Sequence, residues 1–242
     1  VRMDLRERET LLRIAPHLVK PLEFAIPFGD VGAWMRLKLR VGLALYDALA
    51  FGSSLPRHRT TEREAAYHDA RIDSPERLSL ENVLDAAGHG AQALNYVEVT
   101  GAIREGAAIG GVRVTDRLTD AQADIRARLV VNASGPWFER VDGVLAAGVP
   151  ARMHNTKGVH LVCPPMTDRA LVLFSRVDGR LMFAIPRVGY TWLGTTDTDY
   201  SGDPSDVAAT SEDVHYVVDS LRGAFPALAA DDVLYTTAGV RA

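Results

Sequence analysis

The spacing of apolar residues predicts helices in four parts of the chain. The strongest pattern runs from Ala33 to Phe51, where apolar side chains recur three and four residues apart. Similar patterns predict helices over residues 4–14, 76–88 and 211–224. Charged residues interrupt the run at 33–51, which makes it too polar to span a membrane. Its basic and aromatic residues leave two interpretations, packing on a protein core or lying on a membrane surface.

Short apolar runs between turn-forming residues predict strands. A first group is expected at residues 92–105, 109–118 and 125–132. A second group is expected at 158–163, 170–175, 181–186 and 191–196, and a last strand at 232–238. Only short turns separate the members of the second group, so they are expected to pair antiparallel. Residues 52–64 are polar and loop-like, and the whole pattern indicates a mixed α/β and α+β fold.

Composition and charge exclude some classes of function. The 27 basic and 31 acidic residues give a net charge of −4, which offers no basic surface for nucleic acid. Because Cys163 is the only cysteine, an intrachain disulfide and a cysteine-based metal site are excluded, and a buried thiol in a reducing, cytoplasmic setting is expected. The histidines lack metal-ligand spacing, so no metal site is expected. The chain begins at Val1 within a helical pattern and stops at a strand end, which predicts a longer parent protein.

Small residues follow the apolar run Leu129–Val131, in the order Asn132-Ala133-Ser134-Gly135-Pro136. Small side chains where a strand meets a helix let the phosphate or sugar of a ligand approach the backbone, and amides at the helix start bind anions. Pro136 suits the first turn of that helix, where its missing N–H costs little. A tight turn without a ligand explains the pattern equally well.

Three residues near strand ends carry candidate chemistry. His160 follows Lys157-Gly158-Val159, and an imidazole that titrates near neutral pH is suited to take the hydroxyl proton of an alcohol. The alternatives are a strand residue bonded to backbone for His160 and a solvated turn residue for Lys157. Arg241 follows Gly239 at the end of the last strand, and its guanidinium has paired donors that match phosphate geometry.

Two further polar groups have structural interpretations. The stretch 194–197, Gly-Thr-Thr-Asp, forms either a hydroxyl-lined wall or, as turn chemistry favours, a turn whose Asp197 bonds nearby amides. A polar network at the start of the helix at 76–88, capped by Asp73 or Ser74, is expected from Tyr67, Asp69, Asp73 and Arg77. The apolar side chains of that helix available for burial are Leu78, Leu80, Val83 and Leu84.

The stretch from Val130 to Trp137 resembles the second dinucleotide-contacting segment of flavoproteins of the D-amino-acid-oxidase type. With a tryptophan at its end, Trp137, the stretch is similar to the corresponding segment of FAD-dependent glycerol-3-phosphate dehydrogenases. Further stretches agree in order: residues 6–12, 15–18, 42–47, 67–78, 157–160, 194–197, 202–204 and 238–241. The resemblance covers essentially the whole chain. The family's Gly-x-Gly-x-x-Gly motif and its C-terminal flavin-contacting segment are absent, so the chain is interpreted as a central fragment, inactive by itself.

The resemblance implies FAD as the cofactor and oxidation of sn-glycerol 3-phosphate to dihydroxyacetone phosphate, with electrons passed to a quinone. It implies that His160 lies near flavin and substrate as the proton-accepting or orienting residue. Arg241 and Lys157 would bind substrate, Arg241 through its phosphate. Part of the nucleotide wall would be formed by Ala133, Ser134, Gly135, Pro136 and Trp137.

The implied organisation is a helical segment (1–90) packing on the FAD-binding domain, part of that domain (91–152), an antiparallel substrate domain (153–230) and a strand returning to the FAD domain (231–242). The expected location is cytoplasmic, with the inner membrane surface as a peripheral partner. Two alternatives stay open. One is a flavoprotein oxidase that acts on amino acids or, with oxygen, on glycerol phosphate. The other is a non-catalytic binding or membrane-surface module, motivated by the helix at 33–51.

Overall fold

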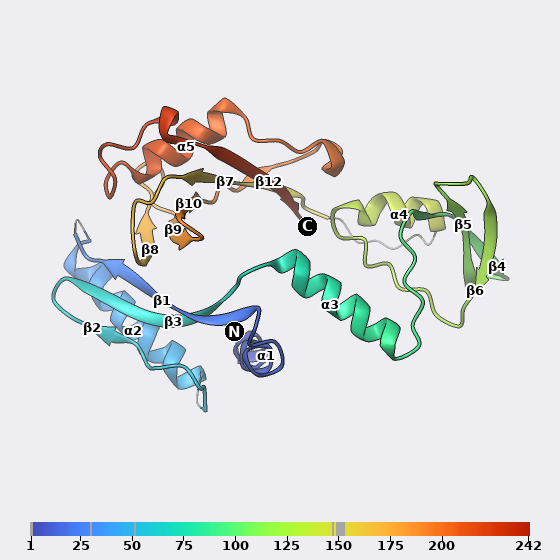
Figure 1. The fold of residues 1–242 in the computed structure, drawn as a ribbon, viewed down its shortest axis with the longest axis horizontal. Coiled ribbons are helices and arrows are strands. Elements are labelled where there is room, and N and C mark those ends of the chain that lie inside the picture. Colours follow the sequence, from blue (N-terminus) through green and yellow to red (C-terminus); the bar gives the residue numbers. More distant parts are fainter. Residues whose placement is uncertain (1, 30, 51, 147, 149–152) are drawn as a thin grey trace. The chain divides into compact units, whose positions relative to one another are not determined.

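The computed structural model describes residues 2–29, 31–50, 52–146, 148 and 153–242, and Figure 1 shows how the elements follow one another. Contacts divide the chain into two compact units. The first contains residues 1–84, 159–196 and 209–237, and the second contains 85–158, 197–208 and 238–242. The expected division at residues 90, 152 and 230 concerns the domains of a whole enzyme and stays a prediction. Its boundary at residue 152 lies outside the described residues.

The larger sheet mixes antiparallel and parallel pairs in the order β11-β7-β10-β9-β8-β1-β3-β2, and β12 pairs with β7. Its strands are β1 (Val19–Pro27), β2 (Arg59–Thr60), β3 (Glu64–Ile72), β7 (Thr156–Cys163), β8 (Ala170–Phe174), β9 (Leu181–Arg187), β10 (Tyr190–Gly194), β11 (Thr198–Asp199) and β12 (Tyr235–Arg241). The pairs β8–β9 and β9–β10 are antiparallel, as their short connections predicted. The strand β7 does not pair with β8, which follows it in the chain, but pairs antiparallel with β10. The second group of predicted strands is therefore confirmed, with small shifts at the ends.

The two faces of this sheet bury different apolar clusters. On one face, Phe24 and Ile26 of β1 and Val172 of β8 form a core with Leu43 of α2 (Ala33–Leu49). On the other face, strand alternation places Leu161 and Leu193, which are fully buried. The helix α5 (Ser211–Leu221) contacts β8 and has buried Val217, Val218 and Leu221. A Thr210–Asp213 capping box starts α5, as the acidic first turn predicted.

The predicted helices at 4–14 and 33–51 are confirmed as α1 (Arg2–Ile14) and α2, although Phe51 lies outside the described residues. Leu43 is the buried residue of α2, and a stripe of large apolar side chains on it is exposed: Trp34, Leu37, Val41 and Leu45. No helix in the described part of the chain is both long and apolar enough to cross a membrane.

The helix α3 (Pro75–Gly88) begins as the sequence predicts but buries less. The Ser74 hydroxyl accepts a hydrogen bond from the Arg77 amide at 3.3 Å, and Pro75 occupies the first helical position. None of its described residues is buried, and the expected burial of its apolar face is therefore wrong for Leu80, Val83 and Leu84, which are 44–55% exposed. The apolar spacing was read correctly, but burial also requires a second element against that face.

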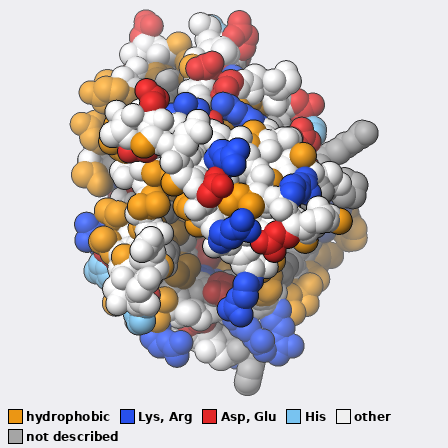
Figure 2. Space-filling model, turned by 90° about the vertical axis from the view of Figure 1, so that its right-hand side faces the viewer, with side chains coloured by type: hydrophobic (Ala, Val, Ile, Leu, Met, Phe, Trp, Pro, Cys, Tyr) orange, Lys and Arg blue, Asp and Glu red, His pale blue; other side chains and the backbone are white. Residues whose placement is uncertain are grey.

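The second unit contains a three-stranded antiparallel sheet of β4 (Val97–Glu105), β5 (Ala108–Asp116) and β6 (Gln122–Arg126). Ion pairs link its strands: Arg113 of β5 lies 3.0 Å from Asp124 of the neighbouring β6, and Arg126 of β6 lies 2.6 Å from Glu105 at the end of β4. Basic and acidic side chains are accordingly interspersed over the middle of the face drawn in Figure 2.

The strand expected at 125–132 ends at Arg126, so the prediction is wrong beyond that residue. Residues 127–134 have no regular structure, and Leu129 and Val131 are 77% and 75% exposed. A strand needs a neighbour for its amides and carbonyls, and no described strand pairs with this segment. The strand expected at 92–105 likewise begins only at Val97.

The strand β3 was missed, because its polar side chains hid the alternation, and the short β2 lies within residues 52–64, which were expected to be a loop. The expected network of four polar residues at the start of α3 is also wrong. Tyr67 stacks on Phe24 at 5.5 Å, Asp69 contacts Arg8, and Arg77 bonds Glu81 of its own helix. In β3, Tyr67 and Asp69 lie on one face of the sheet, where they contact Phe24 and Arg8 instead of Arg77.

Candidate active site

His160 lies on β7 directly opposite Gly194 of β10. A Cβ built on Gly194 would stand 2.9 Å from His160 Cδ2, so the glycine leaves room for the imidazole over the neighbouring strand. Its neighbours along the strand, Val159 and Leu161, are fully buried on the opposite face, whereas His160 is half-buried. The imidazole is therefore held at the half-exposed face of the sheet, where a ligand has access.

The stretch 194–197 follows β10 and has mainly structural contacts. The Thr196 hydroxyl, 1% exposed, accepts a hydrogen bond from the Val159 amide at 2.9 Å. In the second unit, Asp197 lies 3.5 Å from Arg241. These contacts agree with the turn interpretation for Thr196. They add an ion pair to Asp197 that turn chemistry did not predict.

Arg241 ends β12 and packs on the backbone of β7. A Cβ built on Gly158 would lie 2.5 Å from Arg241 Nη1 and 2.6 Å from Nη2, so only glycine accommodates the guanidinium there. Lys157 precedes this glycine and pairs in register with Thr198 of β11. Lys157, Gly158, Asp197 and Arg241 thus gather in the second unit, whereas His160 belongs to the first. The Arg241 side chain is 46% exposed and presents paired donors suited to an oxyanion.

The small-residue turn at 132–137 is built by Asn132. Its side-chain oxygen Oδ1 accepts hydrogen bonds from the Ser134 backbone amide (3.2 Å) and hydroxyl (2.6 Å). Its side-chain nitrogen Nδ2 donates to the Phe138 backbone carbonyl. Gly135 has φ +53°, the left-handed conformation that favours glycine, and nothing lies within 4 Å of a Cβ built there. The 3-10 turn η1 (Gly135–Trp137) and α4 (Phe138–Leu145) follow.

The predicted wall residues are accessible to different degrees. Ala133 and Gly135 are exposed, and Ser134, Pro136 and Trp137 are half-buried. The Pro136 carbonyl accepts a hydrogen bond from the Asn155 side-chain nitrogen Nδ2 at 3.1 Å, which fixes the turn against the residues just before β7. The turn has the open, small-residue surface that close approach of a ligand requires.

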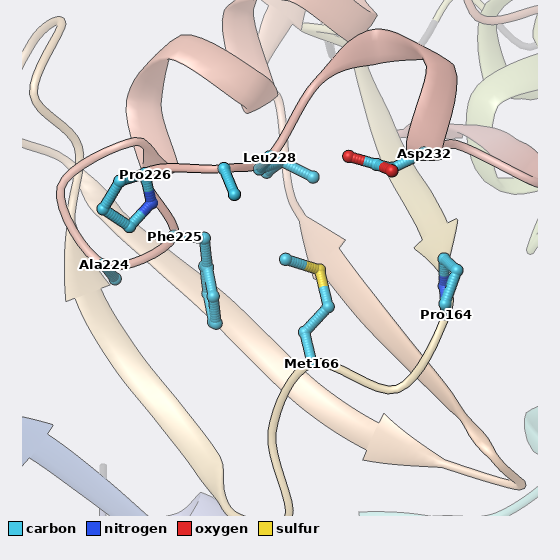
Figure 3. A pocket seen from close by; sticks show the side chains of 8 residues that line it. Pro164, Met166, Ala224, Phe225, Pro226, Leu228 and Asp232 are labelled. Carbon is cyan, nitrogen blue, oxygen red and sulfur yellow. The ribbon is translucent and has the colours of Figure 1, made fainter.

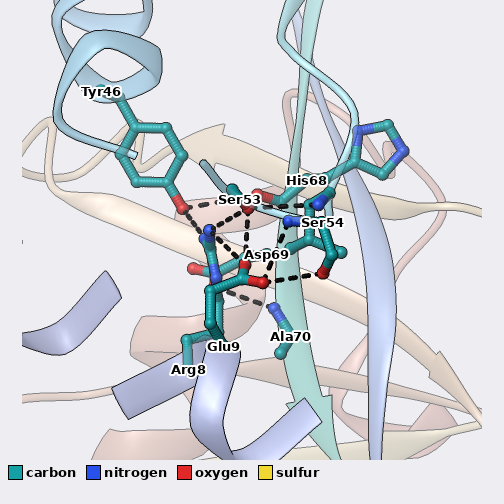
Figure 4. Close-up of polar contacts among 9 residues, drawn as sticks. Arg8, Glu9, Tyr46, Ser53, Ser54, His68, Asp69 and Ala70 are labelled. Carbon is teal, nitrogen blue, oxygen red and sulfur yellow. Dashed lines mark hydrogen bonds and ion pairs between the residues drawn. The ribbon is translucent and has the colours of Figure 1, made fainter. Parts of the chain in front are cut away.

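Sequence reasoning missed a buried polar cluster around Arg8 (Figure 4). The Arg8 side chain is 7% exposed, donates to the Tyr46 hydroxyl and to Ser53 Oγ (3.1 Å), and lies 3.4 Å from Asp69. Burial, followed by the charge of Asp69, raises the pKa of Tyr46. The neighbouring Glu9 accepts hydrogen bonds from Ser53 and from Ser54. The cluster joins α1, α2 and β3.

The hydrogen bonds of the Arg8 cluster hold the loop that follows α2 in place. One signal could have revealed it, since Arg8 stands three residues after Leu5, in the position where an amphipathic α1 carries its buried side chains.

A second missed pair lies beside His160. The Arg187 guanidinium carbon is 4.6 Å from the centre of the Trp192 ring, and that ring centre is 6.2 Å from the centre of the His160 imidazole. Arg187 Nη2 also donates to the Asp73 carbonyl. Sequence spacing could not reveal this arrangement, because it depends on the register of three strands.

An apolar pocket of about 430 Å³ lies at the end of β7, lined by Met166, Phe225 and Leu228 among others (Figure 3). Asp232 is the one charged residue among the described residues that line it, and its carboxylate accepts a hydrogen bond from the Ala229 amide. Burial, followed by the charge of Asp232, raises the pKa of Cys163 to about 11. Cys163 is fully buried, as expected for a structural thiol.

Residues 5–242 match the sequence model of a family described as FAD dependent oxidoreductase. A glycerol-3-phosphate dehydrogenase from Synechocystis sp. is 34% identical over 273 residues, a match that covers 100% of this chain and 49% of the relative. An alpha-glycerophosphate oxidase from Streptococcus pneumoniae is also 34% identical, and the match covers 97% of this chain and 43% of the oxidase. The chain therefore spans about half the length of the curated relatives it matches.

A solved structure agrees with these sequence matches. The glycerol-3-phosphate dehydrogenase from Bacillus halodurans, complexed with FAD, superimposes with a TM-score of 0.78 at 32% identity. The superposition covers 98% of this chain and 46% of that protein. The mixed fold expected from the sequence is thus that of part of a flavoprotein.

Proposed function

The chain belongs to the family of FAD-dependent oxidoreductases, and we propose that it forms part of an enzyme that oxidises sn-glycerol 3-phosphate to dihydroxyacetone phosphate. The observation that carries the proposal is the Arg241 guanidinium on Gly158, in a chain whose relatives are named for glycerol phosphate. The paired donors of a guanidinium suit a phosphate monoester. The substrate and the activity are proposed for the whole protein.

The residues described fit the proposed cofactor on two observations. The exposed Ala133 and Gly135 leave the turn before α4 open to a nucleotide, and Gly194 leaves His160 on an accessible face. Bound FAD supplies the hydride acceptor. The residues Ala133, Ser134, Gly135, Pro136 and Trp137 then form part of the nucleotide wall.

The residues of the protein itself bind the charged phosphate and accept one proton. Arg241 binds the substrate phosphate, and Lys157 is the second residue proposed to bind the substrate. His160 accepts the hydroxyl proton as the carbon is oxidised, since a neutral imidazole is a proton acceptor at physiological pH. The domain assignment is likewise proposed for the whole protein: residues 91–152 belong to the FAD-binding domain, residues 153–230 to the substrate domain, and residues 231–242 return to the former.

The electron acceptor is proposed to be a quinone, and the location cytoplasmic. Oxygen is the alternative acceptor, because some relatives are named oxidases. The purified whole protein should contain FAD and reduce a quinone analogue when given sn-glycerol 3-phosphate. Hydrogen peroxide formed in equal amount to dihydroxyacetone phosphate would assign oxygen instead, and no turnover with glycerol phosphate would overturn the proposed activity.

Substitution of Arg241 tests the phosphate contact. Arg241→Met should raise KM for sn-glycerol 3-phosphate about 10- to 100-fold, because hydrogen bonds to charged groups are worth about 1.5–3 kcal/mol. Arg222→Met is the matched control, since Arg222 is 60% exposed and pairs with Asp219 on α5. Equal KM values for the two variants would remove Arg241 from the substrate site.

The exposed stripe of α2 favours a second function, binding to a membrane surface. Trp34 is 68% exposed and Val41 is 62% exposed, and Lys38 lies 5.4 Å from the Trp34 ring centre. Apolar side chains beside cations are the composition of an interfacial helix. Trp34→Glu should reduce co-sedimentation with vesicles that contain anionic lipid, whereas Met3→Glu, at an apolar residue of α1 that is 73% exposed, should not. Binding unaffected by Trp34→Glu would count against this function.

A further inference from the structure

His160, Trp192 and Arg187 form a diagonal line across three neighbouring strands, β7, β10 and β9. Gly194 is opposite His160, and Trp192 lies two residues from Gly194 on the same face of the sheet. Tyr190 is opposite Arg187 and lies two residues from Trp192 in the other direction. Diagonal neighbours of this kind are about 7–8 Å apart, within reach of aromatic and long side chains.

The distances show that the side chains of neighbouring members of this line lie within this range of each other. The centres of the His160 and Trp192 rings are 6.2 Å apart, with the ring planes tilted by 55°. The Arg187 guanidinium carbon lies 4.6 Å from the centre of the Trp192 ring, well within the range of a cation–π contact. The missing side chain at Gly194 gives the imidazole space to lean toward the indole.

Arg187 is itself held from the other side. Its Nη2 donates to the carbonyl of Asp73, and the Asp73 amide donates to the Leu18 carbonyl at 2.8 Å. The Asp73 carboxylate binds Lys20 at 2.7 Å and Arg71 at 2.9 Å. A fixed main-chain carbonyl therefore holds the guanidinium, the guanidinium lies over the indole, and the indole borders the imidazole.

We propose that Trp192 and Arg187 are positioning residues for His160. The indole limits the imidazole to the conformation that lies over Gly194, and Arg187 keeps the indole in place. A histidine on a half-exposed sheet face has several staggered conformations available, and a proton acceptor works only in the one that meets the substrate hydroxyl. This inference rests on the proposed role of His160 as proton acceptor.

The test uses the whole protein and compares two kinds of readout. Trp192→Leu should lower kcat about tenfold to a hundredfold, the range that small misplacements of reacting groups cost, while KM for sn-glycerol 3-phosphate stays near the wild-type value. Trp192→Phe, which keeps a ring, should retain most of kcat. Arg187→Met should lower kcat in the same direction as Trp192→Leu, and Arg187→Lys, which keeps the cation, should restore part of it.

The second readout follows the imidazole directly by NMR of protein labelled at histidine Cε1, with the His160 signal assigned from its loss in His160→Asn. The signal should shift in Trp192→Leu and in Arg187→Met. It should be unchanged in Arg180→Met, the matched control, whose guanidinium lies 3.4 Å from Asp178 in the turn before β9.

Each outcome decides one question. A kcat and a His160 signal unchanged by Trp192→Leu would overturn the inference, and if that variant fails to fold, the same result with Arg187→Met would overturn it. Full activity of His160→Asn would remove the proposed catalytic role of His160, whatever the NMR signals of the other variants show. Loss of activity in His160→Asn together with normal activity in both other variants would remove only the positioning role.

Discussion

The Arg241 guanidinium lies directly against the α-carbon of Gly158, so closely that a Cβ on this glycine would stand 2.5 Å from Nη1. The contact joins the end of β12 to β7 through the tip of a flexible side chain rather than through backbone. A methyl group at position 158 would therefore displace the guanidinium without disturbing the strands. The absence of a side chain at Gly158 therefore sets where the paired donors of Arg241 lie.

Gly158→Ala is accordingly expected to change binding more than stability. KM for sn-glycerol 3-phosphate should rise about tenfold, because the displaced guanidinium loses its phosphate geometry. The melting temperature should change little, since moving an exposed side-chain tip costs less than about 1 kcal/mol. Gly143→Ala is the control: no atom lies within 4 Å of its Cβ position in α4, so KM should stay constant. An unchanged KM in Gly158→Ala would contradict the assignment.

Loss of the Arg8 side chain is expected to destabilise the fold. Arg8→Met leaves the Tyr46 hydroxyl and the Asp69 carboxylate without a buried cation. Removing one member of a fully buried pair costs about 3–5 kcal/mol, and the 43% exposure of Asp69 reduces this to about 2 kcal/mol. Thermal unfolding of the whole protein measures the effect. Arg6→Met, at an exposed position on the same helix, should melt like the wild type; equal melting of both variants would show that the cluster stabilises nothing.

The pair of Glu64 and Arg169 predicts an acid-dependent loss of stability. Hydrogen bonds from the Arg169 side chain, at 2.8 Å and 3.1 Å, hold the pKa of Glu64 below its usual value. A carboxyl whose pKa is lowered by folding stabilises the protein above its ordinary value near 4.5, and this stabilisation is lost as pH falls through the lowered pKa. Glu64→Gln should therefore melt below the wild type at pH 7, and the difference should narrow as pH falls below 4.5 and close below the lowered pKa of Glu64.

The partial exposure of both side chains limits the size of this effect to about 1 kcal/mol. Glu62→Gln, which removes an exposed carboxylate two residues away, provides the control at each pH. A difference in melting temperature that stayed constant from pH 7 to pH 3 would assign the effect of Glu64→Gln to packing rather than to charge.

Cys163 is expected to resist alkylation in the folded protein. With its pKa raised to about 11, only about one thiol in a thousand is ionised at pH 8, and the thiolate is the reactive form. Peptide mapping after iodoacetamide treatment should show no label at Cys163 until urea unfolds the chain. A cysteine introduced by Val177→Cys, at a site that is 57% exposed, should label in the native state. Equal labelling at the two positions would show that the β7 end opens.

Elements with a complete local signal could be predicted from sequence. The apolar spacing of α2 and the consecutive strands β8, β9 and β10 depend on neighbours a few residues away, and the structure has them where the pattern predicts. The turn around Asn132 and Pro136 is local in the same sense, because Asn132 bonds Ser134 and Phe138.

Elements that depend on a distant partner could not be predicted. The sequence of β3 includes His68, Asp69 and Arg71. These polar residues show no alternating apolar pattern, and they form a strand because β1 pairs with them. Leu129 and Val131 read as strand residues, although no described strand pairs with their segment. The line from His160 to Arg187 depends on register, since a shift of one residue in β10 would turn Trp192 to the opposite face.

The two strands that flank β1 in the sheet, β3 and β8, are synthesised at different times, so β1 completes its pairing in two steps. Ala25 pairs with Ala66 on one side soon after synthesis, but on the other side it faces Leu171, more than half the chain later. Until the ribosome has released β8, one edge of the paired strands β1 and β3 keeps unpaired amides and carbonyls, which is the form in which nascent strands pair with other chains. Synthesis of the segment from α3 to β7 is therefore the interval in which a chaperone would protect this protein.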